Sequence, residues 1–236
     1  MSAPLLVVDA LAACYGPAQV LFDVSFSLRA GEVVTLLGRN GMGKTTTIST
    51  IMGMLPAAAG TVTFEGSALT GLPSYRVAQA GLGLVPEGRQ VFPTLTVEEN
   101  LIATAAARFG PPRWTLETVY ELFPRLAERR RHMGNELSGG EQQMLAIGRG
   151  LMTNPKLLIL DEATEGLAPK IRADIFACLK RLKAEGEAIL LVDKNLRALV
   201  DLADRHVVIE KGHVVWSGSS AELAADPTVR ERYLHI

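Results

Sequence analysis

The sequence predicts an α/β fold with a mostly parallel sheet, an antiparallel β subdomain at the N-terminus and an inserted α-helical subdomain. Three observations support this prediction. Short, continuous apolar runs at 33–38, 157–160 and 188–192 are typical of strands in a sheet that is covered on both faces. Segments that read as helix separate these runs, as crossover connections between parallel strands require. Residues 88–152 read mainly as helix and interrupt the alternation.

The N-terminal part has the alternation of a half-buried antiparallel strand. Within residues 20–29 every second residue is apolar, and the polar residues between them are expected to face solvent. The positions expected to face a core are Phe22, Val24, Phe26 and Leu28. Residues 5–29 and 61–65 together predict a small antiparallel layer, with Gly60 and Gly66 as turns.

The helical block has recognisable start and stop signals. Thr96 is a suitable N-cap and Glu99 stands three residues later, which is the spacing of a capping box. Residues 115–131 predict two short helices that are punctuated by Pro124. Toward the end of the chain, Lys211-Gly212 is expected to form the turn of a hairpin, and short helices follow.

We therefore expect a single domain over residues 1–236. Its core is expected to comprise residues 1–87 and 153–236, and its helical subdomain residues 88–152.

Composition excludes several classes of protein. The net charge of −1 gives no basic field for nucleic acid, so no nucleic-acid partner is expected. The chain has no apolar run near the ~18 residues of a membrane span and no basic leader, which favours a cytosolic protein. Cys14 and Cys178 are isolated and expected to be reduced. The four histidines, His132, His206, His213 and His235, are expected to be structural or on the surface.

The run GRNGMGKT at 38–45 matches the phosphate-loop pattern G-x-x-x-x-G-K-[ST], between a predicted strand and a predicted helix. The glycines let backbone N–H groups turn inward to phosphate oxygens, and the helix N-terminus adds partial positive charge. Lys44 is expected to contact the β- and γ-phosphates, and Thr45 to offer a hydroxyl to Mg²⁺. The sequence thus predicts a P-loop NTPase core that binds ATP and Mg²⁺. The candidate residues of this loop are Gly38, Arg39, Asn40, Gly41, Met42, Gly43, Lys44, Thr45 and Thr46.

Two acids follow the apolar run at 157–160. Asp161 at the end of this strand is expected to reach the Mg²⁺ shell. Glu162 points elsewhere and is the candidate catalytic residue, polarising water for attack on the γ-phosphate.

A second glycine-rich helix start lies at Ser138-Gly139-Gly140. Ser138 and Glu141 have the spacing of a capping box, and the glycines leave N–H groups open to an anion. Lys44 and Asp161 already account for one side of a nucleotide, so a phosphate at Ser138 would belong to a second chain. An ordinary capped helix is the alternative.

The motifs GRNGMGKT, LSGGEQQ and LLILDE, in this order and spacing, resemble the nucleotide-binding domain of ABC transporters over essentially the whole chain. The resemblance implies a head-to-tail dimer that encloses two ATP molecules, each between one subunit's phosphate loop and the other's Ser-Gly-Gly. It also places Tyr15 against adenine, although on the residues alone core packing was an equal alternative.

Finer features resemble the second ATPase subunit of branched-chain amino acid importers. They are VPEGRQVFPTLTVEENL at 85–101, DEATEGLAP at 161–169 and LLVDKN at 190–195. This branch carries glutamate, here Glu87, where most ABC domains have a glutamine that senses Mg²⁺ and the membrane partner. The residues from Gly88 to Thr94 are candidates for coupling to the permease, with an ordinary surface loop as the alternative.

Three positions depart from the wider family. Lys194 stands where most ABC domains have histidine and the branch tends to have glutamine, and it either contacts the γ-phosphate or points to solvent. Ala163 replaces the usual proline, and Ala168 the usual aspartate.

The resemblance implies an ATP-hydrolysing motor subunit on the cytoplasmic face of the inner membrane. Its partners would be a second ATPase subunit, two integral-membrane permeases and, indirectly, an extracytoplasmic solute-binding protein. Branched-chain amino acids are the expected cargo, with amides, urea or aromatic acids as alternatives. The alternative functions are a weakly hydrolytic member of an asymmetric pair, a non-catalytic assembly subunit, a small-molecule kinase and a soluble ABC-type factor that acts on nucleic acid or ribosomes.

Overall fold

The computed structural model describes residues 3–234, and a ten-stranded sheet runs through this part of the chain. The strand order is β5-β4-β1-β2-β10-β9-β3-β8-β7-β6. The strands are β1 (Leu6–Tyr15), β2 (Ala18–Leu28), β3 (Val33–Leu37), β4 (Ala57–Phe64), β5 (Ser67–Ala68), β6 (Leu82–Val85), β7 (Leu157–Asp161), β8 (Ala188–Val192), β9 (Arg205–Glu210) and β10 (His213–Ser219).

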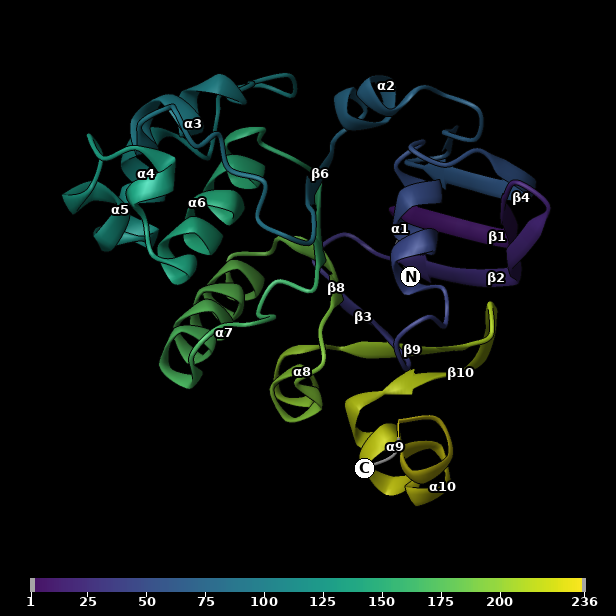
Figure 1. Cartoon of the computed structure of the whole chain (residues 1–236). Coiled ribbons are helices and arrows are strands. Elements are labelled where there is room, and N and C mark those ends of the chain that lie inside the picture. Colours follow the sequence, from purple (N-terminus) through teal and green to yellow (C-terminus); the bar gives the residue numbers. More distant parts are fainter. Residues whose placement is uncertain (1–2, 235–236) are drawn as a thin grey trace.

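Helices cover the sheet and build a separate block beside β6, where α3 to α6 lie away from the antiparallel strands (Figure 1). The helices are α1 (Lys44–Ile51), α2 (Ser74–Gln79), α3 (Val97–Ala103), α4 (Leu116–Leu122), α5 (Pro124–Glu128), α6 (Gly139–Met152), α7 (Pro169–Ala184), α8 (Leu196–Leu202), α9 (Ser220–Ala225) and α10 (Pro227–Val229). A 3₁₀ helix at Gly134–Glu136 precedes α6, and a final turn spans Arg230–Leu234.

The parallel strands that the apolar runs predicted are present. Strands β9, β3, β8, β7 and β6 pair in parallel, and every residue of β3, β7 and β8 is buried. Burial on both faces explains why these strands lack alternation. The prediction of an α/β fold with a mostly parallel sheet is confirmed. Neither β6 nor α2 was predicted from the sequence.

The antiparallel layer is also present, but two details of the prediction were wrong. Phe22 is 44% exposed because β2 carries an extra residue there, between the pairs Leu11–Val24 and Ala13–Leu21. Its ring stacks on His213 instead of entering the core, with the ring centroids 5.0 Å apart. Gly60 is not a turn residue, since it lies within β4, where an added β-carbon would be 2.3 Å from a backbone oxygen of β1.

The predicted local signals of the helical block are found. Thr96 and Glu99 form a reciprocal capping box at the start of α3, and α4 gives way to α5 at Pro124. Lys211 and Gly212 connect β9 to β10, as the hairpin prediction required. Within residues 3–234, none of the helices combines the length and the apolarity that crossing a bilayer demands.

A buried histidine lies between β3 and the start of α9. The ring of His206 on β9 is 2.6 Å from the Thr35 hydroxyl of β3 through Nδ1 and 2.9 Å from the Ser220 hydroxyl through Nε2. This position agrees with a structural role. His235 lies outside the described residues. Both cysteines are free, and Cys178 is buried.

Candidate nucleotide-binding site

The phosphate loop connects β3 to α1 at the carboxyl end of the parallel sheet. Its glycines Gly38, Gly41 and Gly43 have φ angles of 145°, 77° and 109°, which L side chains rarely adopt. At Gly38 a β-carbon would also lie 2.3 Å from the carbonyl oxygen of Ile209. The loop therefore depends on glycine for its curl, and α1 begins at Lys44 without a side-chain cap.

Lys44 is folded back over this loop. Its Nζ donates to the carbonyl oxygens of Gly38 at 2.8 Å and of Arg39 at 2.9 Å. Burial lowers the pKa of the ammonium, whereas the carboxylates of Glu162 and Asp161 oppose that shift. The side chain is thus a cation held within the loop, in reach of an anion that binds there.

Other residues of the phosphate loop either line the cavity above the loop or fix the shape of the loop. The sulfur of Met42 accepts a hydrogen bond from the N–H of Lys211 at 3.3 Å, and the Met42 carbonyl accepts one from Gly212 at 3.1 Å. Met42 therefore ties the loop to the β9–β10 hairpin. Thr46 is buried within α1 and borders the cavity.

Asp161 ends β7 and is 3% exposed. Burial raises the pKa of its carboxyl, and a hydrogen bond from the Thr45 side chain opposes this shift. Its Oδ1 is buried and finds no hydrogen-bond partner among the residues that the structure describes. An unpartnered carboxylate oxygen beside a threonine hydroxyl is the donor chemistry that Mg²⁺ prefers, so Thr45 and Asp161 fit the predicted metal site.

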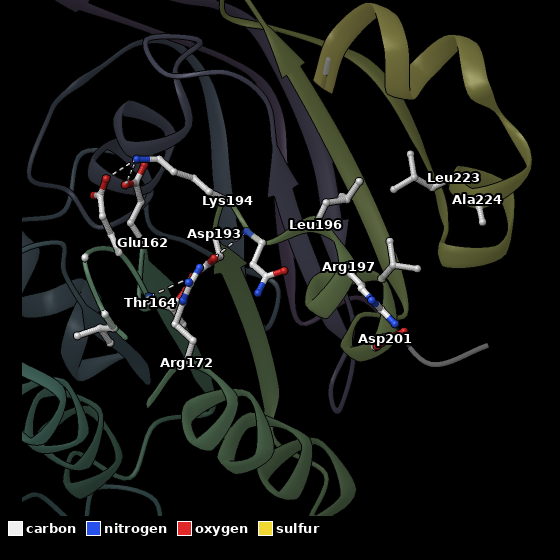
Figure 2. A pocket seen from close by; sticks show the side chains of 15 residues that line it. Glu162, Thr164, Arg172, Asp193, Lys194, Leu196, Arg197, Asp201, Leu223 and Ala224 are labelled. Carbon is white, nitrogen blue, oxygen red and sulfur yellow. Dashed lines mark hydrogen bonds and ion pairs between the residues drawn. The ribbon is translucent and has the colours of Figure 1, made fainter. Parts of the chain in front are cut away.

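Glu162 occupies a left-handed backbone conformation, with φ of 51°, and its N–H donates to the Val192 carbonyl at 2.8 Å. Burial raises the pKa of its carboxyl, which the neighbouring ammonium of Lys194 opposes. Lys194 Nζ lies 3.1 Å from Glu162 Oε2 and also pairs with Glu165 (Figure 2). In this structure the Lys194 side chain is 47% exposed and its ammonium contacts two carboxylates, an arrangement that neither sequence-based alternative included.

One cavity of about 380 Å³ gathers most of the predicted nucleotide residues. It brings together the glycine loop with Lys44, Glu87, Glu162 and Lys194, which come from four separate segments of the chain. Sequence reasoning missed two of its residues, Val20 and Glu165, although Glu165 lies within the quoted run DEATEGLAP. The lining residues are Val20, Asn40, Gly41, Gly43, Lys44, Thr45, Thr46, Glu87, Glu162, Glu165 and Lys194.

Tyr15 does not border this cavity. It ends β1 with 52% of its surface exposed. An exposed ring at a strand end has the surface that stacking needs, and the equal alternative of core packing is excluded by this exposure.

Ser138, Gly139 and Gly140 also do not border the cavity. Ser138 caps α6 through a reciprocal box with Glu141, whose Oε2 accepts from the Ser138 N–H and hydroxyl at 2.8 Å each. A β-carbon at Gly139 would lie 2.7 Å from Nη1 of Arg89, which places that guanidinium over the helix start. This element is preformed, yet it is separate from the phosphate loop of its own chain.

A larger cavity of about 970 Å³ adjoins Glu162 and lies between the loops that follow β7 and β8 (Figure 2). Asp193 ties these loops together, because its Oδ2 accepts from the Thr164 N–H at 3.0 Å and from the Thr164 hydroxyl at 2.6 Å. The backbone on either side of Glu162 and Lys194 is fixed by these bonds.

Comparison with known proteins gives consistent results. A family model described as "ABC transporter" matches residues 21–165. BraG of Pseudomonas aeruginosa, a high-affinity branched-chain amino acid transport ATP-binding protein, is 45% identical over 98% of this chain and 99% of its own. LptB of Haemophilus influenzae, a lipopolysaccharide export system ATP-binding protein, is 33% identical over 98% and 97%. A crystal structure of an ABC transporter's ATP-binding cassette in its ADP conformation has a TM-score of 0.83 at 28% identity, covering 98% of both chains.

Proposed function

The chain belongs to the ABC transporter family as its ATP-binding and ATP-hydrolysing subunit, and from this premise we propose that it drives an importer of branched-chain amino acids. The observation that carries the cargo assignment is the 45% identity with BraG, which spans nearly the full length of both chains. The runs at 85–101 and 161–169, which resemble the same branch, support it.

We assign the roles of the site residues from their positions. The uncapped start of α1 and Lys44 bind the phosphates of ATP, and the side chains of Thr45 and Asp161 hold Mg²⁺. The metal ion supplies charge stabilisation to the phosphate oxygens. Glu162, which borders the same cavity, orients a water molecule toward the γ-phosphate and accepts a proton from that water as it attacks. Burial raises the pKa of the Glu162 carboxyl, which suits a base.

The proposed assembly is a head-to-tail pair with a second ATPase subunit, either another copy or a different chain. Ser138, Gly139 and Gly140 would contact the ATP that is held by the other subunit's phosphate loop. Their separation from this chain's own cavity supports that arrangement. ATP would then favour the closed pair because both subunits contact it, and hydrolysis would remove that preference.

We propose that the segment from Gly88 to Thr94 transmits this motion to two permease subunits at the cytoplasmic face of the membrane. The segment is anchored to α6, because Arg149 donates to the Gln90 carbonyl at 2.7 Å and its guanidinium stacks 4.1 Å above the Phe92 ring. A cavity of about 680 Å³ joins this segment to Thr45 and Asp161. A permease that binds residues 88–94 would therefore contact the chain close to the proposed metal ligands Thr45 and Asp161. An extracytoplasmic solute-binding protein would deliver the cargo to the permeases.

The test is to purify the complex through this chain, identify its membrane and solute-binding partners, and measure which solutes stimulate ATP turnover. Stimulation by leucine, isoleucine or valine is expected. Stimulation by amides, urea or aromatic acids alone would replace the cargo assignment. Lack of turnover in a complete complex would make the chain a mainly ATP-binding member of an asymmetric pair.

A further inference from the structure

Three charged side chains from two neighbouring loops meet at the edge of the phosphate cavity. Lys194 comes from the loop between β8 and α8, whereas Glu162 and Glu165 come from the loop between β7 and α7. The ammonium of Lys194 lies 3.1 Å from Glu162 Oε2 and is hydrogen-bonded to Glu165 Oε1. It therefore bridges the two carboxylates, and one of them is the proposed base.

The backbone around this cluster is held in place independently of the three side chains. Asp193 accepts bonds from Thr164 and, through Oδ1, from the Asn195 N–H at 3.0 Å. The Glu162 N–H is bonded to β8 at Val192. The adjustable part is thus the side chains, of which Glu165 and Lys194 are 44% and 47% exposed, compared with 11% for Glu162.

A cation is needed to hold the carboxylates of Glu162 and Glu165 close to each other and to that of Glu87. One carboxylate oxygen each from Glu87, Glu162 and Glu165 lies within 4.8 Å of the others. Like charges at this separation repel, and partial exposure weakens the repulsion without removing it. Lys44 is already bonded to two loop carbonyls, so the ammonium that bridges two of these acids is that of Lys194.

We propose that Glu165 and Lys194 form a positioning pair for Glu162. Glu165 holds the Lys194 ammonium over the Glu162 carboxylate, and that contact fixes the direction of the carboxylate that meets the attacking water. Glu165 acts only through Lys194. The inference rests on the proposed role of Glu162 as the base, and it assigns Lys194 to the base rather than to the phosphates of the bound nucleotide.

The experiment compares variants in the purified complex: Glu165→Gln, Lys194→Gln, Lys194→Arg, the double variant Glu165→Gln/Lys194→Gln, and Glu162→Gln. Lys156→Gln is the matched control, because it breaks an ion pair with Glu65 at 2.6 Å that is similarly exposed and lies outside the cavity. The readouts are kcat and KM for ATP, the Kd of a fluorescent ATP analogue, and the Tm of the nucleotide-free protein.

We expect Lys194→Gln to lower kcat about tenfold, because a misdirected base loses near-attack geometry, while KM and Kd stay within about twofold. Glu165→Gln lowers kcat about threefold, and the double variant is no worse than Lys194→Gln alone because the two residues act in series. Lys194→Arg recovers most of the rate, since it keeps the cation. The Tm changes by less than about 2 °C in every variant, because exposed ion pairs stabilise proteins little.

Two results would overturn the inference. One is an unchanged kcat in Lys194→Gln, and the other is a large rise in Kd for the ATP analogue with kcat preserved, which would assign Lys194 to the phosphates. Additive losses in the double variant would likewise remove Glu165 from the pair. Failure of the proposed function is distinguishable, because it would appear as unimpaired turnover in Glu162→Gln.

Discussion

The two glycine-rich helix starts of this chain, at α1 and at α6, differ in whether a side chain caps the first turn. At α1 the N-cap is Gly43 in a left-handed conformation, and its first-turn N–H groups receive no side-chain cap. At α6 the cap is Ser138, which closes a reciprocal box with Glu141. Both starts present backbone N–H groups, as helix N-termini do.

Their surroundings differ more than their backbones. The α1 start lies beside Lys44, the carboxylate of Glu162 and an Asp161 oxygen that has no hydrogen-bond partner among the described residues, so the proposed cation, metal ligand and base lie together. The α6 start has the guanidinium of Arg89 above Gly139 and no residue in the phosphate cavity. We infer from this difference that a glycine-rich helix start forms a complete phosphate site only when other strands bring charged groups to it, and we propose that α6 supplies one half of a site.

The largest expected effect comes from removing the cation of the complete site. Lys44→Ala should weaken ATP binding at least about a hundredfold and abolish hydrolysis, because a buried ammonium next to phosphate contributes several kcal/mol. Calorimetric titration with ATP measures the change. Lys180→Ala, at an exposed position of α7 that does not border the phosphate cavity, is the control. Near-normal affinity in Lys44→Ala would show that the α1 start is not the phosphate site.

A smaller effect is expected at the half site. Gly139→Glu should leave ATP binding by the isolated chain within about twofold, yet lower turnover about a hundredfold or more, because the new carboxylate faces the triphosphate held by the other subunit. Ala225→Glu, at an exposed position of α9 that does not border the phosphate cavity, is the control for adding a charge. Turnover that survives Gly139→Glu would reduce α6 to an ordinary capped helix.

Caps themselves contribute modestly to stability. Ser138→Ala removes the side chain that accepts from the Glu141 N–H and should lower the free energy of unfolding by about 1 kcal/mol, whereas Gly43 has no cap to lose. Urea denaturation of the nucleotide-free chain checks this difference. Ser67→Ala, on an exposed edge strand, should leave stability unchanged.

A pH-dependent effect is expected beside β3, the strand that leads into the phosphate loop and α1. Burial lowers the pKa of His206, which contacts Thr35 on β3, to about 4. Its unfolded-state pKa is about 6.5, so the unfolded chain binds the extra proton between these values and stability is lost as pH falls through that window. The Tm of the wild type should therefore drop more between pH 7 and pH 4.5 than that of His206→Gln. Parallel Tm curves for the two proteins would contradict this account.

Local signals were the part of this structure that the sequence predicted well. The capping boxes at Thr96 and Ser138, the phosphate loop and the uniformly apolar strands depend on residues close in the chain. Phe22 and Gly60 were misassigned because irregular pairing between β1 and its neighbours decides which side chains face the core.

The contacts of Lys194 could not be read from the sequence for a related reason. They arise because β7 and β8 are neighbouring strands of the sheet, so the loops that follow them meet. Lys194 and Glu165, which are 29 residues apart in the sequence, are thereby brought into contact. No local sequence pattern indicates that these two loops are in contact. Glu165 lies within the run DEATEGLAP, which resembles the importer branch, but its pairing with Lys194 follows only from the fold.

The central claim is that each ATP is enclosed by two subunits, with Lys44 from one and Gly139 from the other. The most direct measurement mixes two variants of this chain, Lys44→Ala and Gly139→Glu, each inactive alone, and records ATP turnover. A head-to-tail pair of one of each contains a single intact site, so the account predicts recovery to about a quarter of wild-type turnover in an equal mixture. A mixture that stays inactive, while the wild-type chain pairs and turns over ATP under the same conditions, would contradict it.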